Sequence, residues 1–278
     1  MRNARACARH NLRRLIATPR AWAVLILTLL YVENQFAPIR LMLQVENLKL
    51  GWPGMTAYFF SDAQITMMAG LMGLMLLFDV PLTDETQRYI IARTGRGAWG
   101  RGQVLYTVAM SALYLAVVAL ALLLFQLPWA EWSSGWSGGL EGLVKNGLYE
   151  QYDTMLDYDP WVMDAYAPIQ AMGLTLALHA LAYASLALTQ FAVNVRFGSR
   201  LGFLAASAPL LFDAVIEEFF GIEAFYFSPV TLSRLTTLDY GDGMGRPPVW
   251  YAFVVLTGLT AGLVFWCARL TKRREMLL

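Results

Sequence analysis

The chain has 278 residues, of which 58% are hydrophobic and 15% are charged. Soluble globular domains have about 45 to 50% apolar and about 25% charged residues, so this composition excludes an ordinary soluble domain and indicates an integral membrane protein. The 21 basic and 20 acidic residues nearly cancel. This balance argues against a nucleic-acid-binding protein, because such a protein needs a basic surface that displaces counterions from phosphates.

The first segment, residues 1–20, is rich in arginine and leads into an apolar run. We expect an amphipathic basic segment on the cytoplasmic membrane surface, with Leu12, Leu15 and Ile16 facing lipid and the arginines facing anionic headgroups. A disordered basic tail is the alternative. A cleaved signal peptide is disfavoured, because no small-x-small cleavage site follows Tyr31.

Six segments are long and apolar enough to cross a hydrocarbon core of about 30 Å, which takes roughly 20 helical residues. They are 21–43, 63–80, 104–127, 168–193, 201–216 and 249–268. The first is the weakest, because Glu33, Asn34 and Gln35 interrupt its apolar run. The sequence therefore predicts an all-α, polytopic integral membrane protein with six transmembrane helices.

The distribution of lysine and arginine predicts the orientation, because positive charge resists translocation across the membrane. Basic residues gather in segments 1–20, 81–103, 194–200 and 269–278, whereas the loop 126–167 is acidic with Lys145 as its one basic residue. We therefore expect a six-helix domain over 21–268, with outer loops 44–62, 126–167 and 217–248. Both termini, including the basic tail 269–278, are then cytoplasmic.

The inner loop 81–103 carries the signals of a short helix. Thr83 or Asp84 can cap it, Asp84 and Glu85 favour its positive N-terminal end, and Asp84 and Arg88 form an i, i+4 pair. The helix should end near Thr94.

Two side chains of this helix, Tyr89 and Ile90, are less polar than a solvated loop requires. A membrane or a partner protein would have to cover them, which indicates a docking element. The alternative is a surface helix whose charges only follow the orientation rule.

The residues of this loop resemble a known family. A span ending in "FDVP", followed by "DET" and "RYIIARTGRGAWGRGQ", is similar to the loop between the second and third spans in permease subunits of type-2 ATP-binding cassette (ABC) exporters. The turn "YFSPVTLSRL" before the last span also fits. The resemblance implies a coupling helix that docks on a separate ATPase through residues Asp84, Glu85, Arg88, Tyr89, Ile90 and Arg93.

Further expectations follow from the resemblance. The chain would be a multi-pass protein of a bacterial plasma (inner) membrane that exports a substrate and is not itself an enzyme. It would pair with a second permease chain, identical or homologous, and with two ABC ATPase subunits that bind ATP and magnesium. Membrane lipid is the remaining partner, and nucleic acid is not expected.

No cofactor or metal site is expected within the chain. The sequence from Gly95 to Gly100 matches G-x-G-x-x-G, but that motif binds dinucleotides only inside a βαβ unit, and no G-x-x-x-x-G-K-[ST] phosphate cradle occurs. Cys7 and Cys267 are too few for a disulfide framework and lack zinc-site spacing, so we expect both to be reduced thiols.

Polar residues within the spans are candidates for a translocation path, because ionisable groups are costly in a membrane. The candidates are Glu33, Asn34, His179 and Asp213. For His179 the alternative is an ordinary hydrogen-bonded contact between helices. The pattern does not identify the substrate, and it leaves the aromatic loop 126–167 either as an interfacial belt with re-entrant helices or as a lid.

Two other functions remain open. Glu217 and Glu218 suggest an intramembrane protease of the CAAX-processing type, but Ile222 stands where that motif has arginine, and no histidine follows residue 179. The second is a non-transporting membrane immunity or regulatory protein, which fits six spans equally well. The inner loop favours the exporter, because a pure binding protein does not need a charged helix that exposes Tyr89 and Ile90.

Overall fold

The computed structural model describes residues 2–83, 85–132, 135–152, 154, 156, 158–213, 215–239, 241 and 243–273. The fold is all-α, as expected, apart from one two-residue parallel strand pair. The longer helices are α1 (Arg2–Ile16), α2 (Pro19–Val45), α4 (Ala63–Leu76), α5 (Glu85–Thr94), α6 (Arg96–Gln126), α10 (Pro168–Phe197), α11 (Ser199–Asp213) and α13 (Val249–Arg273).

The remaining elements are short and lie mostly between these helices. They are α3 (Met55–Ser61), α7 (Gly138–Val144), α8 (Leu148–Gln151), α9 (Pro160–Ala165), α12 (Ile216–Phe220), four 3-10 turns η1 (Leu127–Trp129), η2 (Ile222–Tyr226), η3 (Thr231–Ser233) and η4 (Leu235–Thr237), and the paired strands β1 (Leu50–Gly51) and β2 (Ala130–Glu131).

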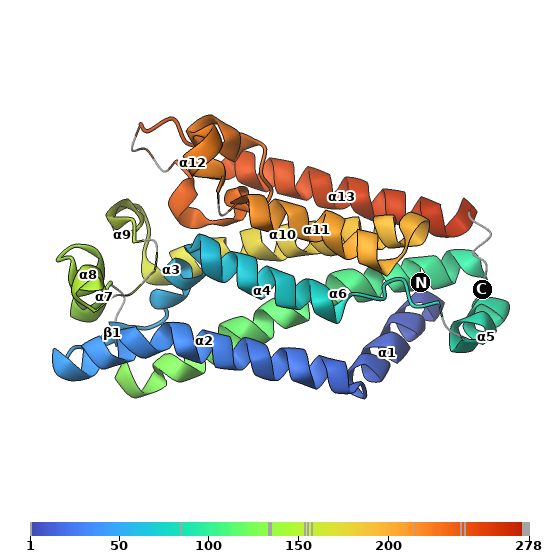
Figure 1. Ribbon diagram of the computed structural model, residues 1–278, viewed down its shortest axis with the longest axis horizontal. Helices are drawn as coiled ribbons and strands as arrows, with labels where there is room; N and C mark the ends of the chain where they lie inside the picture. Colours follow the sequence, from blue (N-terminus) through green and yellow to red (C-terminus); the bar gives the residue numbers. More distant parts are fainter. Residues whose placement is uncertain are drawn as a thin grey trace.

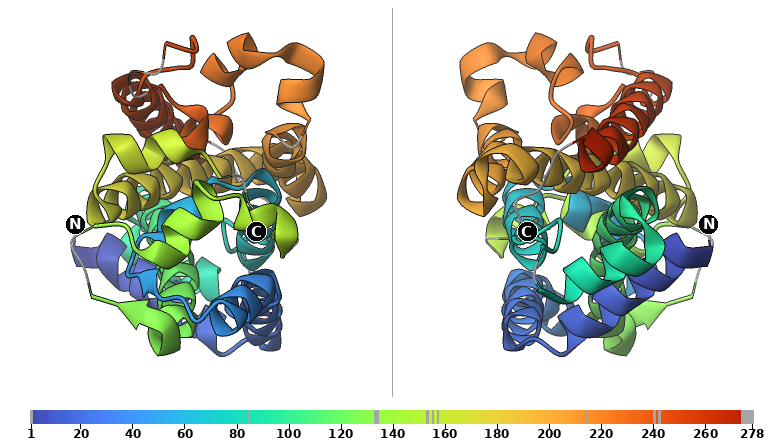
Figure 2. Two further views of the ribbon diagram at one scale, coloured as in Figure 1. Left: turned by 90° about the vertical axis from the view of Figure 1, so that its left-hand side faces the viewer. Right: turned by 90° about the vertical axis from the view of Figure 1, so that its right-hand side faces the viewer.

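The long helices lie side by side along one axis of the molecule (Figure 1). Views along that axis show α11 and α13 on one side, α1 and α2 on the other, and α4, α6 and α10 between them (Figure 2). Helix α10 is the most buried of the long apolar helices described, which makes it the centre of the core.

Four of the described helices, α2, α6, α10 and α13, are long and apolar enough to cross a membrane, and the bent pair α3 and α4 makes a fifth candidate. The chain is therefore a membrane protein by the length and composition of its helices. Helix α11 has 15 residues, which at about 1.5 Å per residue covers roughly 22 Å and is shorter than the hydrocarbon core. Six spans remain a prediction.

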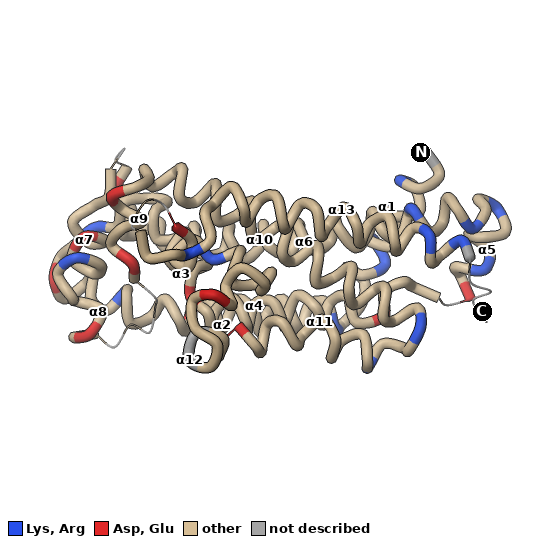
Figure 3. Tube along the Cα trace, turned by 90° about the horizontal axis from the view of Figure 1, so that it is seen from above, with Lys and Arg blue, Asp and Glu red and all other residues tan. Residues whose placement is uncertain are grey.

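Charge is separated along the long axis (Figure 3). Lysine and arginine gather at the end that carries α1, α5 and the last turn of α13, which we call the basic end. Aspartate and glutamate gather around α7, α8 and α9, which we call the acidic end. This separation is the pattern that the orientation rule requires, although the placement of the basic end in the cytoplasm stays a prediction.

Helix α1 confirms a helix in the N-terminal segment. Of the three residues expected to face lipid, Ile16 is exposed and Leu12 is half-buried, but Leu15 is buried, so the expectation is wrong for Leu15. Ala4, Cys7 and Leu15 are buried in protein rather than in lipid, and α1 packs along α6. A Cβ atom at Gly102 of α6 would lie only 2.7 Å from Cβ of Cys7. Glycine at this position therefore allows the two helices to approach closely.

The first predicted span is not interrupted. Helix α2 continues through Glu33, Asn34 and Pro38 to Val45. Nη1 of Arg40 donates to a carboxylate oxygen of Glu33 at 2.6 Å. The charge of Glu33 thus has a partner on the same helix, which lowers the cost of placing it there.

The helix of the second predicted span, 63–80, ends at Leu76, and side chains of α10 bond the carbonyl groups at and beyond this end of α4. Gln190 donates to the carbonyl oxygens of Leu74 and Leu77 at 3.2 and 2.9 Å. Asn194 donates to the carbonyl oxygens of Phe78 and Val80 at 3.0 and 2.6 Å. The last carbonyls of a helix lack partners within it, so these amides stabilise a helix end inside the protein.

Part of the predicted outer loop 217–248 is not a surface loop. Every residue from Val230 to Leu238 is buried, and η3 and η4 pack against α10 while η4 also packs against α3. The hydroxyl groups of Ser233 and Thr237 donate to backbone carbonyls within the segment. Because its polar groups find local partners, the segment can lie in the core without helical backbone bonding.

Candidate functional site

Helix α5 is fixed to the bundle by one buried side chain, Gln87. Its Oε1 accepts from Nε1 of Trp99 at 2.8 Å and from Nε2 of Gln103 at 3.1 Å, and its Nε2 donates to Oδ1 of Asn11 at 3.2 Å. These four residues are buried and come from α1, α5 and α6. The three bonds to Gln87 favour one orientation of α5, although Nδ2 of Asn11 is buried without a hydrogen-bond partner among the described residues.

The opposite face of α5 is exposed. It carries Glu85, Arg88, Tyr89, Ala92 and Arg93, which follow the i, i+3, i+4, i+7, i+8 spacing of a single helical face. Tyr89 exposes 75% of its surface, the largest exposure of a hydrophobic side chain on this helix. We call these five residues the docking face, after the role that the resemblance implies for α5.

The predicted helix in the inner loop is therefore confirmed, and its predicted residues divide into two groups. Glu85, Arg88, Tyr89 and Arg93 lie on the docking face, whereas Ile90 is half-buried. Asp84 lies outside the described residues.

Helix α5 is joined to α6 by Gly95, and it ends where the sequence predicts. Gly95 has a φ of +78°, a conformation that favours glycine. Gly100 serves packing, since a Cβ there would collide with the side chain of Thr271 on α13, whereas a Cβ at Gly97 would make only an ordinary contact with Lys272. The G-x-G-x-x-G pattern thus reflects a helix break and close helix contacts.

A second group of polar side chains lies where α3 meets α4. The two helices are bent by 78° at Asp62, whose Oδ1 accepts from the backbone nitrogen of Ile65 and caps α4. The hydroxyl of Ser61 accepts from the backbone nitrogen of Leu235 at 3.1 Å. The buried segment 230–238 is therefore hydrogen-bonded to the break between α3 and α4.

Asp213 is held in this region by a buried ion pair. Nη1 of Arg234 lies 3.2 Å from Oδ2 of Asp213, and both side chains are almost fully buried. The hydroxyl of Thr231 donates to the other carboxylate oxygen. The pair joins the end of α11 to the segment 230–238, and separating it would leave a charge without its partner in the core.

His179 lies in the same part of the core. Its Nδ1 is 3.0 Å from the carbonyl oxygen of Thr175, and its Nε2 is 3.5 Å from the hydroxyl of Thr66. The ring also contacts Phe60, and the charge of Arg234 acts on it. We call Ser61, Thr66, His179, Asp213, Thr231 and Arg234 the buried polar cluster.

The four candidates for a translocation path therefore do not form one site. His179 and Asp213 belong to the buried polar cluster. Glu33 is half-exposed on α2 and paired with Arg40, and Asn34 is exposed. No bond described for these two residues of α2 connects them to the cluster.

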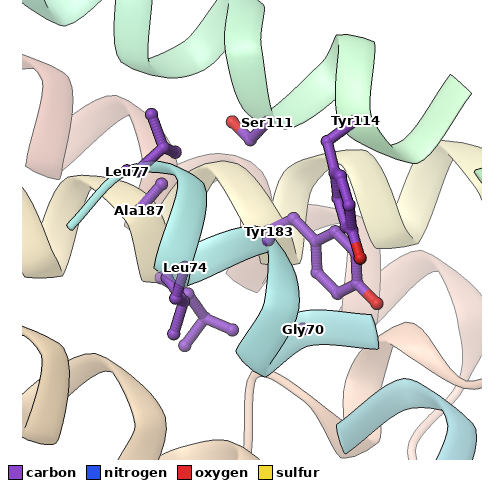
Figure 4. A pocket seen from close by; sticks show the side chains of 9 residues that line it. Gly70, Leu74, Leu77, Ser111, Tyr114, Tyr183 and Ala187 are labelled. Atoms are coloured by element: carbon purple, nitrogen blue, oxygen red, sulfur yellow. The ribbon is translucent and has the colours of Figure 1, made fainter. Parts of the chain in front are cut away.

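A small cavity lies between α4, α6 and α10, on the side of the buried polar cluster that faces the basic end. Its volume is about 10 Å³, which is close to the space that one water molecule requires. The rings of Tyr114 and Tyr183 lie next to one another beside Gly70 (Figure 4). The hydroxyl of Tyr114 donates to the carbonyl oxygen of Ala69.

The acidic end is tied together by pairs between distant segments. Nζ of Lys145 bonds Asp164 at 2.8 Å, and this bond raises the pKa of Lys145. Nη1 of Arg246 bonds Asp159 at 2.8 Å. These contacts, with the strand pair β1 and β2, hold the loop 126–167 as a folded cover of short helices, and the interfacial belt and the lid both stay predictions.

Sequence reasoning missed Gln87, Arg234 and the segment 230–238. Gln87 lies one turn before Ile90 and Ile91, on the face opposite to Tyr89, so the helical period could have marked it as inward-facing. Arg234 sits in a stretch of leucine and threonine with no sign that it is buried. Its partner Asp213 lies 21 residues away.

Among the described residues, no three histidine, cysteine, aspartate or glutamate side chains are placed to hold a metal ion. Both cysteines are free thiols. Comparison with known proteins found no match to this chain among family models, curated proteins or solved structures.

Proposed function

We propose that this chain is the permease subunit of an ABC exporter and that a separate ATPase subunit docks on α5. The observation that carries the proposal is the two-sided construction of α5. One face is locked to α1 and α6 through Gln87, while the docking face exposes Tyr89 between charges of both signs. A helix that only covered the protein surface would need no aromatic side chain there.

The connections of α5 suit the transmission of motion. The helix is followed, after Gly95 alone, by the 31 residues of α6, and Gln87 also bonds Asn11 of α1. A displacement of α5 by a bound ATPase would therefore act on two helices at once. Packed helices move as bodies rather than deform continuously.

In this proposal the path for the substrate passes the α3 and α4 break. Broken helices in membrane proteins are tolerated where they line a cavity or lie within protein. His179 and Asp213 lie at this break, and helix movement would be needed to open a route, since the cavity described between α4, α6 and α10 holds about 10 Å³. Two such chains would complete the exporter.

The docking face can be tested by photo-crosslinking in cells. The photoreactive amino acid p-benzoylphenylalanine at Tyr89 should capture a protein that mass spectrometry identifies as an ATPase with a G-x-x-x-x-G-K-[ST] phosphate cradle. The control places the same amino acid at Trp132, which is similarly exposed at the acidic end. Capture of an ATPase at Trp132 but not at Tyr89 would contradict the proposal.

Charge and contact variants test the same face. Glu85→Arg reverses a charge in the first turn, which opposes the helix dipole by about 0.3 to 1 kcal/mol, and Tyr89→Asp removes apolar contact. Both should still insert into the membrane but lose ATPase association. Glu131→Arg, an exposed change at the acidic end, should keep it. Normal association of the Glu85→Arg, Tyr89→Asp double variant would favour the non-transporting alternative.

A further inference from the structure

Two arginines lie against aromatic rings where α10 and α13 run side by side toward the basic end. The guanidinium carbon of Arg196, in the last turn of α10, lies 5.8 Å from the centre of the Trp266 ring. The guanidinium carbon of Arg269 lies 4.3 Å from the centre of the Phe265 ring, and both of these residues belong to α13. Both distances are within the range of a cation–π contact, about 6 Å. We call Arg196 and Arg269 the stacked arginines.

The stacked arginines come from different helices but lie on the same surface. Arg269 follows Trp266 by three residues on α13, and residues at this spacing are neighbours on a helix surface. Trp266 also contacts Arg196 of α10. One exposed ring is therefore adjacent to a positive charge from each helix.

The charges of the stacked arginines are not neutralised within the described part of the chain. Neither guanidinium group is in an ion pair there, and α6, α10 and α13 contain no aspartate or glutamate. Both arginines are exposed, so a ligand can reach them. A guanidinium group that stacks on a ring keeps the N–H donors at its edge, and these suit the oxygens of a phosphate.

The surface next to the stacked arginines is apolar. Phe265 exposes 60% and Trp266 45% of its surface, on a helix that is long and apolar enough to cross a membrane. One turn further from the basic end, Gly262 is also exposed, and a Cβ atom there would meet nothing within 4 Å. Tryptophan prefers the interface between headgroups and hydrocarbon. The stacked arginines therefore lie at headgroup depth, beside a surface of α13 that continues into the hydrocarbon.

We propose that the stacked arginines bind the phosphate of one anionic phospholipid, whose acyl chain lies along α13 beside Phe265 and Gly262. Two positive charges without a carboxylate favour an anionic headgroup over a zwitterionic one, which carries its own cation. A cytoplasmic protein could reach the arginines but would not cover the apolar surface that continues from them. The site does not depend on the proposed transport function, because it requires only that α13 is embedded in a membrane.

Native mass spectrometry of the full-length protein in detergent can measure the binding of added lipids. Dioleoyl phosphatidylglycerol should be retained in preference to dioleoyl phosphatidylcholine. Arg269→Gln should weaken retention of the phosphatidylglycerol about fivefold, since one arginine near a membrane surface contributes about that factor. Equal retention of the two lipids would overturn the proposal.

The chain offers a control of equal charge for Arg269. Arg101 of α6 is also exposed and also belongs to the basic end, but within the described residues it contacts no aromatic ring at cation–π distance. Arg101→Gln should leave the retention of phosphatidylglycerol unchanged. An equal loss in both variants would reduce the effect to bulk charge and would contradict the site.

A second pair of variants tests the aromatic surface without changing any charge. Trp266→Leu removes the ring against which Arg196 lies and should lower the retention of phosphatidylglycerol. Trp250→Leu removes an exposed tryptophan near the other end of the same helix and should not. Equal effects of the two variants would show that Trp266 is not part of the site.

Inorganic phosphate distinguishes a lipid from a free anion. Added at millimolar concentration, it should not displace the bound phosphatidylglycerol, because it cannot replace the contact of the acyl chain with α13. Displacement by inorganic phosphate would show that the stacked arginines bind a phosphate group alone, and it would overturn the assignment of a lipid.

Discussion

At the scale of single residues, buried amides have a large role in this structure. Gln87 fixes α5 to its neighbours, while Gln190 and Asn194 cap the end of α4. An amide presents both donors and an acceptor, so one side chain can serve several backbone or side-chain groups without introducing a charge. This property suits a core in which ionised groups are costly.

The role of Gln87 leads to a first prediction. Gln87→Leu should leave Asn11, Trp99 and Gln103 without their shared partner, at a cost of about 1 to 3 kcal/mol for each buried polar group that stays unpaired. Hydrogen exchange should then speed up across 85–94. Thr86→Leu, on an exposed neighbour, is the control, and unchanged exchange in Gln87→Leu would mean that other contacts hold α5.

At the scale of elements, close helix packing depends on the positions of glycines, which have no side chain. Gly102 lets α1 approach α6, and Gly100 lets α13 approach the same helix. The two contacts lie within one turn of α6, close to the connection with α5. The start of α6 is thus the place where three helices meet.

This close approach gives a second prediction. In Gly102→Ala the new Cβ would lie 2.7 Å from Cβ of Cys7 and 3.0 Å from the carbonyl oxygen of Ala4. Overpacking of this kind costs about 1 to 3 kcal/mol, so α1 should shift away from α6. Exposure of the Cys7 thiol, measured by alkylation and peptide mass spectrometry, should increase.

The pKa of Cys7 makes this assay sensitive. Burial raises the pKa of the Cys7 thiol to about 11, and the thiolate is the reactive form. Alkylation of the unmodified protein should therefore be slow at neutral pH and rise as the pH approaches that value. Gly97→Ala is the control, because its nearest new contact is Cε of Lys272 at 3.6 Å. Equal labelling of both variants would contradict the packing explanation.

The elements differ in how far the sequence predicts them. Helix α5 could be predicted because its start, end and exposed face follow from neighbouring residues. The break between α3 and α4 and the burial of 230–238 could not, because they depend on contacts such as Ser61 with Leu235, which are 174 residues apart. A hydrophobic pattern in one sequence contains no information about such pairs.

At the scale of the whole molecule, the separation of charge sets the expected orientation. The basic end carries the docking face, while the acidic end carries the folded cover of α7, α8 and α9 (Figures 1 and 3). The composition was sufficient to predict a helical membrane protein. Composition did not decide the number of spans, because this number depends on whether α11 and α4, which are shorter than a hydrocarbon core requires, cross the membrane.

A topology prediction follows from the same separation. Reporter fusions at Arg96, Arg196 and Leu278 should report the cytoplasm, and fusions at Gly139 and Gly241 should report the outside, because lysine and arginine resist translocation. A reporter that is active only outside and one that is active only inside should give opposite results at each position. One reversed position would contradict six spans with both termini inside.

The capping of α4 by α10 has a consequence for how the protein is made. Gln190 bonds the carbonyl of Leu74, which lies 116 residues earlier in the chain. At about 5 to 20 residues per second, a ribosome needs roughly 6 to 23 s to add that length. During this delay the carbonyls of Leu74 and Leu77 keep local backbone partners, whereas those of Phe78 and Val80 require water or headgroups until Asn194 is made. We therefore expect the turn that follows 63–76 to reach its final conformation only after α10 has been synthesised.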